Sequence, residues 1–192
     1  THFFIISLRN TFRLENTEIM KNLVIGQSGG PTAVINASLY GAVKAFRESG
    51  ADGHVLGMIN GIEGFLADHV MDLSTDLSDK ELELLKLTPA AYLGSCRYKL
   101  PADLDSEVYP AIFDNFREMN IGYFLYVGGN DSMDTVDKLS RYAEKIGSDV
   151  KFIGIPKTID NDLVLTDHTP GFGSAAKYVA SMVREVAIDA SV

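Results

Sequence analysis

Short apolar runs alternate with longer amphipathic segments along most of this chain. Four runs have the length of strands, and three longer segments repeat apolar residues every three or four positions, as helices do. The runs span 23–25, 54–59, 123–127 and 151–155, and the helical segments span 33–48, 109–119 and 133–146. This alternation is typical of a parallel sheet with helices on both faces. We therefore expect an α/β fold built on a three-layer, Rossmann-like open parallel sheet.

Two further segments carry helix signals. Ser78 and Glu81 are spaced as a capping box for a short helix that stops before Pro89, and a last helix begins at 171–174. The apolar positions that share one face of this last helix are Ala175, Val179, Met182, Val183 and Val186. No internal repeat or low-complexity linker interrupts the pattern, so residues 20–192 are expected to form one α/β domain.

Residues 1–19 differ from this pattern. They begin without Met and carry the apolar patch Phe3 to Ile6, which is short for a secretory signal and is followed by no small-residue cleavage site. Met20 directly precedes the first predicted strand. Residues 1–19 are therefore interpreted as an N-terminal extension upstream of a natural start at Met20, and an extra edge strand or helix is an equally good interpretation.

Composition narrows the possible partners and the compartment. The net charge of −9 argues against a nucleic-acid surface, which needs clustered Lys and Arg. One cysteine, Cys96, excludes an internal disulfide framework, and the four histidines have no spacing suited to zinc. We expect a cytoplasmic protein with neither a nucleic-acid nor a membrane partner.

Three loops of unusual composition follow predicted strands. They span 27–32, 128–132 and 156–162. In an open parallel sheet the loops at the carboxyl ends of strands gather along one edge, where ligands bind. We therefore expect these three loops to face one cleft.

The first loop, Gln27 to Thr32, is rich in glycine and leads into a predicted helix. Its backbone N–H groups and the positive end of the helix dipole suit a phosphate oxygen. The sequence is neither a P-loop nor a dinucleotide motif. A purely structural turn explains this loop equally well.

The second loop places Asn130 and Asp131 after two glycines. Their oxygens suit a hard cation such as Mg²⁺ bound to substrate phosphates. The two glycines alone are also compatible with tight packing, so this loop does not decide the function by itself.

The third loop is the densest in charge. Asp160 and Asp162 are suited to accept a proton from an attacking hydroxyl or to support a metal, and Lys157 and Thr158 to contact a transferring phosphoryl group. A solvated acidic turn is the alternative. Upstream, Arg97 offers a planar fork for phosphate or a surface ion pair.

Five motifs occur in order at plausible spacing. They are Gly-Gly-Pro-Thr at 29–32, Gly-Ser-Cys-Arg at 94–97, Gly-Gly-Asn-Asp-Ser at 128–132, Pro-Lys-Thr-Ile-Asp-Asn-Asp at 156–162 and Thr-Pro-Gly-Phe-Gly at 169–173. With these motifs the chain resembles the phosphofructokinase family, and specifically its pyrophosphate-dependent branch. The resemblance implies that family's N-terminal domain, a homo-oligomeric glycolytic enzyme, and Mg²⁺-assisted phosphoryl transfer between pyrophosphate and the 1-hydroxyl of fructose 6-phosphate.

The resemblance also implies roles for single residues. Asp160 matches the proton acceptor, with Lys157 and Arg97 as the other catalytic residues. The implied substrate-binding residues are Thr158, Ile159 and Asp160, and the implied donor-binding residues are Gly29, Gly30, Arg97, Asp131 and Ser132. For the metal it implies Asp162 and the position of Asn130, where many members carry an acid and this chain offers only a neutral oxygen.

Two of these positions indicate the donor. ATP-using members carry small glycines where this chain has Asp131 and Lys157, whereas the pyrophosphate branch carries Asp and Lys. A carboxylate at 131 would repel an α-phosphate by about 4 kcal/mol at 4 Å and an effective dielectric of about 20. Lys157 would offset charge on the leaving phosphate.

Family members continue well beyond the equivalent of Val192. We therefore expect this chain to be the donor-binding half of a longer enzyme, to lack the sugar-phosphate half, to be inactive alone and to expose an apolar face. Two alternatives stay open. An ATP-dependent 6-phosphofructokinase fits the fold but not Asp131 with Lys157, and a non-catalytic regulatory subunit fits Asn130 but not Asp160 with Asp162.

Overall fold

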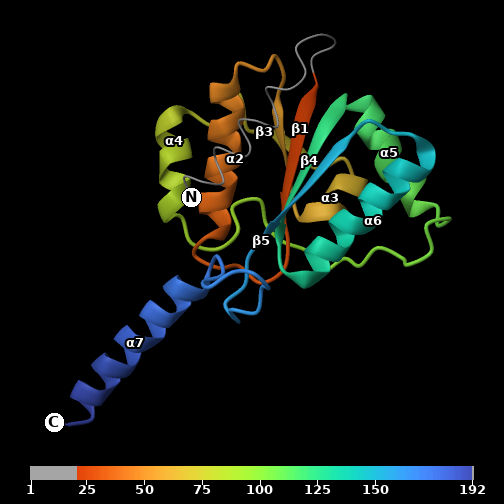
Figure 1. The fold of residues 1–192 in the computed structure, drawn as a ribbon. Helices are drawn as coiled ribbons and strands as arrows, with labels where there is room; N and C mark the ends of the chain where they lie inside the picture. The colour runs from red at the N-terminus through yellow and green to blue at the C-terminus, as the bar shows by residue number, and fades with distance from the viewer. Residues whose placement is uncertain (1–20, 192) are drawn as a thin grey trace.

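The computed structural model describes residues 21–191 of the chain. The interpretation of residues 1–19 as an extension lies outside this range. Figure 1 shows a twisted central sheet with helices on both sides and one long helix that extends away from them.

Five strands form the sheet, in the order β3-β2-β1-β4-β5. They are β1 (Asn22–Gln27), β2 (Val55–Met58), β3 (Val70–Asp72), β4 (Ile121–Gly128) and β5 (Lys151–Pro156). Strands β2, β1, β4 and β5 are parallel, and β3 is antiparallel to β2. The expected parallel sheet is confirmed for these four strands. The short antiparallel strand β3 was not predicted, because a strand of three residues is too short to show a periodic signal.

Helices cover both faces of the sheet, which confirms the three-layer α/β fold (Figure 1). One face carries α2 (Ile35–Ser49), α4 (Asp79–Leu84) and the 3-10 turn η1 (Leu85–Leu87). The other carries α3 (Gly61–Leu66), α5 (Val108–Glu118) and α6 (Asn130–Ile146). The predicted capping box is present at Ser78 and Glu81, at the start of α4. Helix α3 was not predicted from the sequence.

The core consists of two apolar clusters, one on each face of the sheet. Strand β4 contributes to both because its side chains alternate: Leu125 and Val127 join the cluster under α2, and Phe124 and Tyr126 join the cluster under α5 and α6. All eight residues of β4 are buried. A strand buried on both faces is apolar throughout, which is why the run at 123–127 was recognisable.

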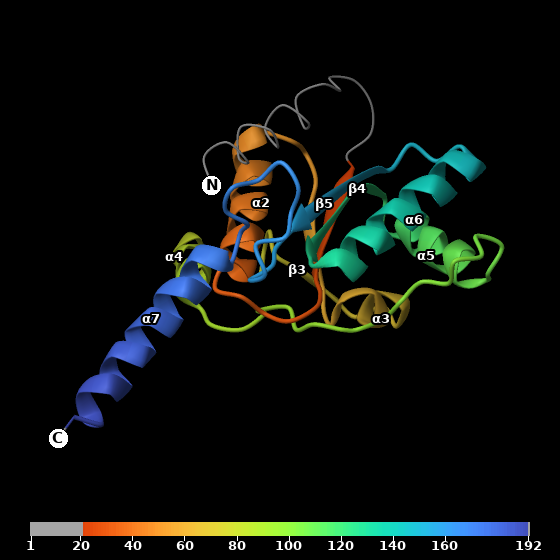
Figure 2. The same cartoon turned by 60° about the horizontal axis from the view of Figure 1, so that its bottom comes forward.

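The last helix, α7 (Phe172–Asp189), forms as predicted but has no buried residue. In both views it points away from the sheet and the other helices (Figure 2). Within residues 21–191, no helix combines the length and the apolar character needed to cross a membrane.

Candidate active site at the carboxyl edge of the sheet

The three unusual loops lie side by side at the carboxyl ends of β1, β4 and β5. The Lys157 N–H donates to the Gly128 carbonyl at 2.9 Å, and the Ser28 N–H donates to the Val127 carbonyl at 2.9 Å. The Lys157 ammonium donates to the Gly30 carbonyl. These contacts bring the three loops together at one edge of the sheet, as expected, and the cleft between them stays a prediction.

Lys157 is the buried cation of this edge. It is 4% exposed, and burial lowers its pKa below the ordinary 10.5, because a charged ammonium loses hydration inside the protein. A β-carbon added to Gly29 would lie 3.4 Å from the ammonium, and Gly29 has a φ of +73°. Glycine at 29 therefore lets the backbone turn and approach the cation closely.

The segment 94–99 is fastened onto the first loop. The Ser95 hydroxyl donates to the Gly29 carbonyl at 2.6 Å, and the Cys96 carbonyl accepts from the Gly29 N–H at 3.4 Å. Cys96 itself is 6% exposed, and its sulfur lies 3.6 Å from the Tyr126 hydroxyl. Arg97, the next residue, is exposed.

The buried side-chain amides of Gln27 and Asn36 hold the residues before segment 94–99 in place. Asn36 was not identified from the sequence. The Gln27 side chain donates to Asn36 Oδ1 at 2.9 Å and accepts from the Leu93 N–H at 2.9 Å. Asn36 donates to the carbonyls of Thr88 and Ala90, each at 2.8 Å. The sequence did contain a signal for Asn36, because this amide lies on the apolar side of a predicted helix and a buried amide needs hydrogen-bond partners.

Helix α6 begins at Asn130, three residues earlier than the predicted Met133, so Asn130, Asp131 and Ser132 form its first turn. Ser132 is 2% exposed, and its hydroxyl would lie 1.9 Å from a β-carbon at Gly128. Its side chain therefore packs back onto the glycine and is not displayed at the surface.

Asp131 is held by a residue that the sequence reasoning did not single out. Its carboxylate pairs with the Lys99 ammonium at 3.1 Å, and both side chains are 70% exposed. The residue-type pattern gave no signal for Lys99, because only the fold brings segment 94–99 to the start of α6.

The segment around Asp160 is built on backbone contacts with the loop before α7. The Thr158 N–H donates to the Pro170 carbonyl at 3.0 Å, and the Thr169 hydroxyl donates to the Thr158 carbonyl at 3.1 Å. Asn161 has a φ of +54°, and its Oδ1 accepts from the Thr169 N–H at 2.9 Å. These contacts fix the loop at positions that flank Asp160.

Asp160 and Asp162 are exposed, as is Ile159. The Asp160 N–H donates to the Thr158 hydroxyl at 3.1 Å, and within residues 21–191 neither carboxylate forms an ion pair. Both acids are thus available to a ligand approaching the carboxyl edge.

Three residues of this edge carry side-chain oxygens that could help to hold a metal. In the described part of the chain, no three His, Cys, Asp or Glu side chains are grouped to hold an ion. Asn130, Asp131 and Asp162 can each supply an oxygen, which matches Mg²⁺ bound mainly by phosphate oxygens and water.

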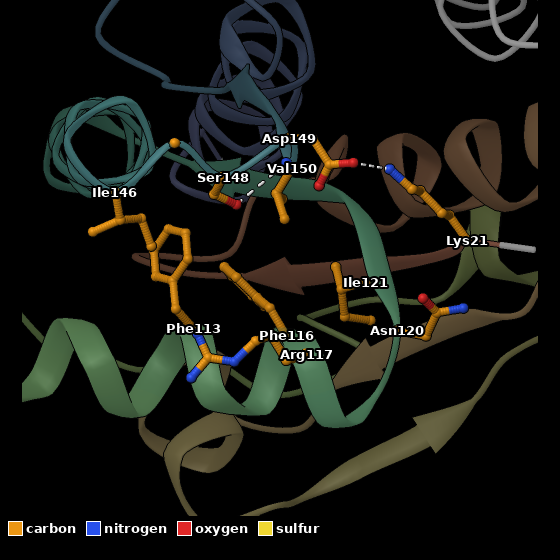
Figure 3. A pocket seen from close by; sticks show the side chains of 11 residues that line it. Lys21, Phe113, Phe116, Arg117, Asn120, Ile121, Ile146, Ser148, Asp149 and Val150 are labelled. Carbon is orange, nitrogen blue, oxygen red and sulfur yellow. Dashed lines mark hydrogen bonds and ion pairs between the residues drawn. The ribbon is translucent and has the colours of Figure 1, made fainter. Parts of the chain in front are cut away.

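A separate hollow of about 400 Å³ lies at the opposite, amino edge of the sheet (Figure 3). Phe113, Phe116, Ile121 and Val150 contribute apolar side chains to it, and the Lys21–Asp149 ion pair lies beside it. None of the predicted site residues lines this hollow. The candidate active site is therefore the carboxyl edge.

The comparisons with known proteins give the family of this three-layer α/β domain. The sequence profile described as Phosphofructokinase matches residues 22–192, so the chain belongs to the phosphofructokinase family. It is 45% identical over 171 residues to the pyrophosphate--fructose 6-phosphate 1-phosphotransferase of Halomonas elongata. It is 39% identical over 167 residues to the sulfofructose kinase of Alkalicoccus urumqiensis.

A solved structure shows the same arrangement. The pyrophosphate-dependent phosphofructokinase of Nitrosospira multiformis superposes with a TM-score of 0.82 and 42% identity, over 89% of this chain and 42% of that one. The match with the Halomonas relative covers 88% of this chain and 40% of the relative. This chain therefore spans about two fifths of the length of the curated relatives that it matches.

Proposed function

We propose that this chain is the phosphoryl-donor-binding part of an enzyme that transfers a phosphoryl group reversibly between pyrophosphate and the 1-hydroxyl of fructose 6-phosphate. The Halomonas and Nitrosospira relatives carry names that support this activity. The observation that carries the proposal is Lys157, a buried cation within reach of the glycine-rich loop. A buried cation beside a glycine-rich loop suits a compact, highly charged donor.

In this proposal Asp160 performs the proton transfer. The sugar hydroxyl oxygen forms a bond to the terminal phosphorus, the bridging P–O bond of pyrophosphate breaks, and the hydroxyl proton passes to the Asp160 carboxylate. Lys157 stabilises the charge that develops on the departing phosphate, and Arg97 holds the phosphoryl oxygens. In the reverse direction protonated Asp160 returns its proton to the sugar oxygen.

We propose Mg²⁺ as the cofactor, bound through the phosphate oxygens with Asp162 and the first turn of α6 nearby. When bound, the ion neutralises negative charge on the transferring group. The Asp162 carboxylate would supply charge to the ion, and Asn130 would add only a neutral oxygen.

We assign the donor preference to Asp131 and Lys157. The repulsion between the Asp131 carboxylate and an α-phosphate is smaller than the value expected from an effective dielectric of about 20. Asp131 is 70% exposed and pairs with Lys99, so the local dielectric is close to that of water. Repulsion of an α-phosphate at 4 Å is then about 1 kcal/mol instead of about 4 kcal/mol. Lys157, buried and next to Gly29, carries the larger share.

The enzyme is proposed to act in the cytoplasm as a homo-oligomer with these two substrates as its partners. The single cysteine supports a reducing compartment, and the family resemblance supports an oligomer.

The test uses a chimera in which residues 22–192 replace the matching part of the Halomonas elongata relative, so that an enzyme of full length is assayed. We expect turnover of fructose 6-phosphate with pyrophosphate and little with ATP. Turnover with ATP alone would refute the donor, and fructose 6-phosphate binding without turnover by either donor would favour a regulatory subunit.

The variant Asp131→Gly with Lys157→Gly sharpens this test. We expect the ratio of ATP to pyrophosphate turnover to rise, chiefly through loss of pyrophosphate use. Asp134→Gly is the control, because it adds a glycine to the same helix while leaving the predicted site intact. Unchanged pyrophosphate use in the double variant would contradict the assignment.

A further inference from the structure

Tyr126 is a buried residue of β4 that the proposed chemistry does not use. Its side chain is 1% exposed and belongs to the apolar cluster under α5 and α6. It lies two positions before Gly128, where the second loop of the carboxyl edge begins. Because a buried tyrosine hydroxyl needs a polar partner, the group that it meets at this edge is informative.

The Tyr126 hydroxyl meets the segment that carries Arg97. It forms a hydrogen bond with the Cys96 sulfur at 3.6 Å, in which either group can donate. Burial raises the pKa of Tyr126 above its ordinary 10.0, and a hydrogen bond with Ser28 lowers it by less. The hydroxyl is therefore neutral and protonated at neutral pH.

Neighbouring segments carry glycine where they pass this side chain. Gly26 is the residue of β1 that pairs with Tyr126, and a β-carbon added there would lie 2.9 Å from the tyrosine ring. A β-carbon added to Gly61, the first residue of α3, would lie 2.8 Å from both the Tyr126 hydroxyl oxygen and the Cys96 sulfur. Contacts below 3.0 Å are closer than real β-carbons allow. The hydroxyl and the thiol thus fill a close-packed space in which Cys96 has little freedom.

On its other side, Cys96 is tied to the glycine-rich loop. Its carbonyl accepts from the Ser28 hydroxyl at 3.3 Å and from the Gly29 N–H at 3.4 Å. Both hydrogen bonds are long for their type, so they hold the segment only weakly by themselves. The contact with Tyr126 adds support from the core side.

Arg97 depends on this support. It is exposed, and within residues 21–191 its guanidinium forms no ion pair. The direction in which its side chain leaves the segment is therefore set by the backbone at Cys96. In the proposed function Arg97 holds the phosphoryl oxygens, and a planar fork needs accurate placement to do so.

We propose that Tyr126 is a positioning residue for donor binding: its buried hydroxyl holds Cys96 in place and thereby aims Arg97 at the phosphoryl group bound beside Gly29. The inference rests on the proposed function, because it deepens the role given there to Arg97. A tyrosine that merely fills the core is the alternative, and a phenylalanine would serve that purpose equally well.

A double-mutant cycle in the Halomonas chimera tests this proposal. Tyr126→Phe keeps the ring and removes the hydroxyl, Arg97→Ala removes the guanidinium, and a third variant carries both changes. We expect Tyr126→Phe alone to lower kcat/KM for pyrophosphate about fivefold, mainly through a higher KM. When Arg97 is already replaced, the same change should have almost no further effect.

Tyr142→Phe is the matched control, because it removes a hydroxyl from the same apolar cluster and lies on α6. It should leave kcat/KM for pyrophosphate nearly unchanged. Equal losses from Tyr126→Phe with and without Arg97 would overturn the proposal, since a general loosening of the core does not act through Arg97.

The cycle also separates this inference from the proposed function. If Arg97→Ala lowers pyrophosphate use and Tyr126→Phe does not, only the inference fails. If Arg97→Ala has no effect, the role of Arg97 in the proposed function fails as well.

Alkylation of Cys96, followed by mass spectrometry, is a readout that needs no donor. The thiol is 6% exposed and should react slowly in the unaltered chimera and in Tyr142→Phe. We expect it to react several times faster in Tyr126→Phe, because the segment opens more often without the hydroxyl. An unchanged rate would show that the hydroxyl does not hold Cys96 and would overturn the proposal, whichever donor the enzyme uses.

Discussion

The two edges of the sheet use their charged side chains in different ways. At the amino edge, Lys21 pairs with Asp149 and Arg117 pairs with Asp114 on the same helix. At the carboxyl edge, the Lys157 ammonium donates to the Gly30 carbonyl and, within residues 21–191, neither it nor Asp160 nor Asp162 forms an ion pair. The charges at the amino edge neutralise one another, whereas at the carboxyl edge, among the described site residues, only Asp131 is paired, with Lys99, and Lys157, Asp160 and Asp162 are left to meet a ligand.

This difference follows from the backbone. Parallel strands place the first residues of the next helix at their carboxyl ends, where N–H groups and the positive dipole favour anions. At the amino ends, α5 and α6 finish in turns at Asn120 and Gly147, both with positive φ. The same sheet thus provides one edge for binding and one edge for stability.

The largest expected effect is on turnover at the carboxyl edge. Asp160→Asn in the chimera should lower turnover by about a thousandfold, because the hydroxyl loses its proton acceptor. The measurement is initial velocity with saturating pyrophosphate. Asp167→Asn, which alters another exposed acid of the same loop, is the control, and an equal loss in both variants would contradict a specific role for Asp160.

The next effect is a difference in unfolding free energy between a variant at the carboxyl edge and one at the amino edge. Asn36→Leu removes the partner of two carbonyls and of the Tyr92 N–H, and should lower the free energy of unfolding by about 3 kcal/mol. Asn22→Leu at the amino edge removes bonds to Met119 and His54 and should cost about 1–2 kcal/mol.

Urea unfolding and calorimetric binding of pyrophosphate would both be measured on these variants of the chimera. Of the two variants only Asn36→Leu should weaken pyrophosphate binding, because Asn36 contacts the segment that leads to Arg97 and Asn22 does not. If Asn22→Leu weakened binding as much, the division between the edges would fail.

A smaller effect concerns pH. Burial lowers the pKa of Lys157, so its charge, and with it pyrophosphate affinity, should be lost at a pH below the ordinary 10.5. Folding stability should rise with pH over the same interval, because the unfolded chain binds that proton more tightly. Calorimetry of the chimera from neutral pH upward would show the loss.

Lys157→Arg is the matched control for this pH effect, since a guanidinium keeps its charge throughout the range. Its residual pyrophosphate affinity should therefore vary less with pH than that of Lys157. Parallel pH profiles for Lys and Arg would show that another group titrates.

The smallest effect is expected at the amino edge. A hydrogen bond from Lys21 lowers the pKa of Asp149, so this pair stabilises the fold above pH 3.8 and the contribution is lost as the pH falls through the lowered value. Because Asp149 is 74% exposed, Asp149→Asn should cost only about 0.5 kcal/mol in urea unfolding at neutral pH. A loss of unfolding free energy several times larger would mean that the Lys21–Asp149 pair stabilises the fold more than an exposed ion pair normally does.

Much of the architecture was predictable because it rests on strong local signals. Strand β4 is an apolar run, and the Ser78–Glu81 box marks the start of α4. Strand β3 and helix α3 were missed because three and six residues carry too little periodicity. The start of α6 was placed three residues late, because Asn130 to Ser132 are polar and have turn-like residue types.

For the candidate site, sequence reasoning identified the loops but not all the residues that hold them. Lys157, Gly29 and Gly30 do lie together, as the rule for parallel sheets requires. Asn36 and Lys99 were not singled out, because each acts on a segment more than 30 positions away in the sequence. Their partners are set only when the chain is folded.

By itself, the sequence determined the α/β class, the order of the main strands and helices, and the three loops at one edge, since all of these depend on short-range pattern and on the geometry of parallel strands. Tertiary structure alone decided which charges are buried. Lys157 is buried, which strengthens the electrostatic effect of its charge. Asp131 lies in solvent beside Lys99, which weakens the effect of the Asp131 charge. The physical reason is that the strength of a charge depends on its surroundings, and those are assembled from distant parts of the chain.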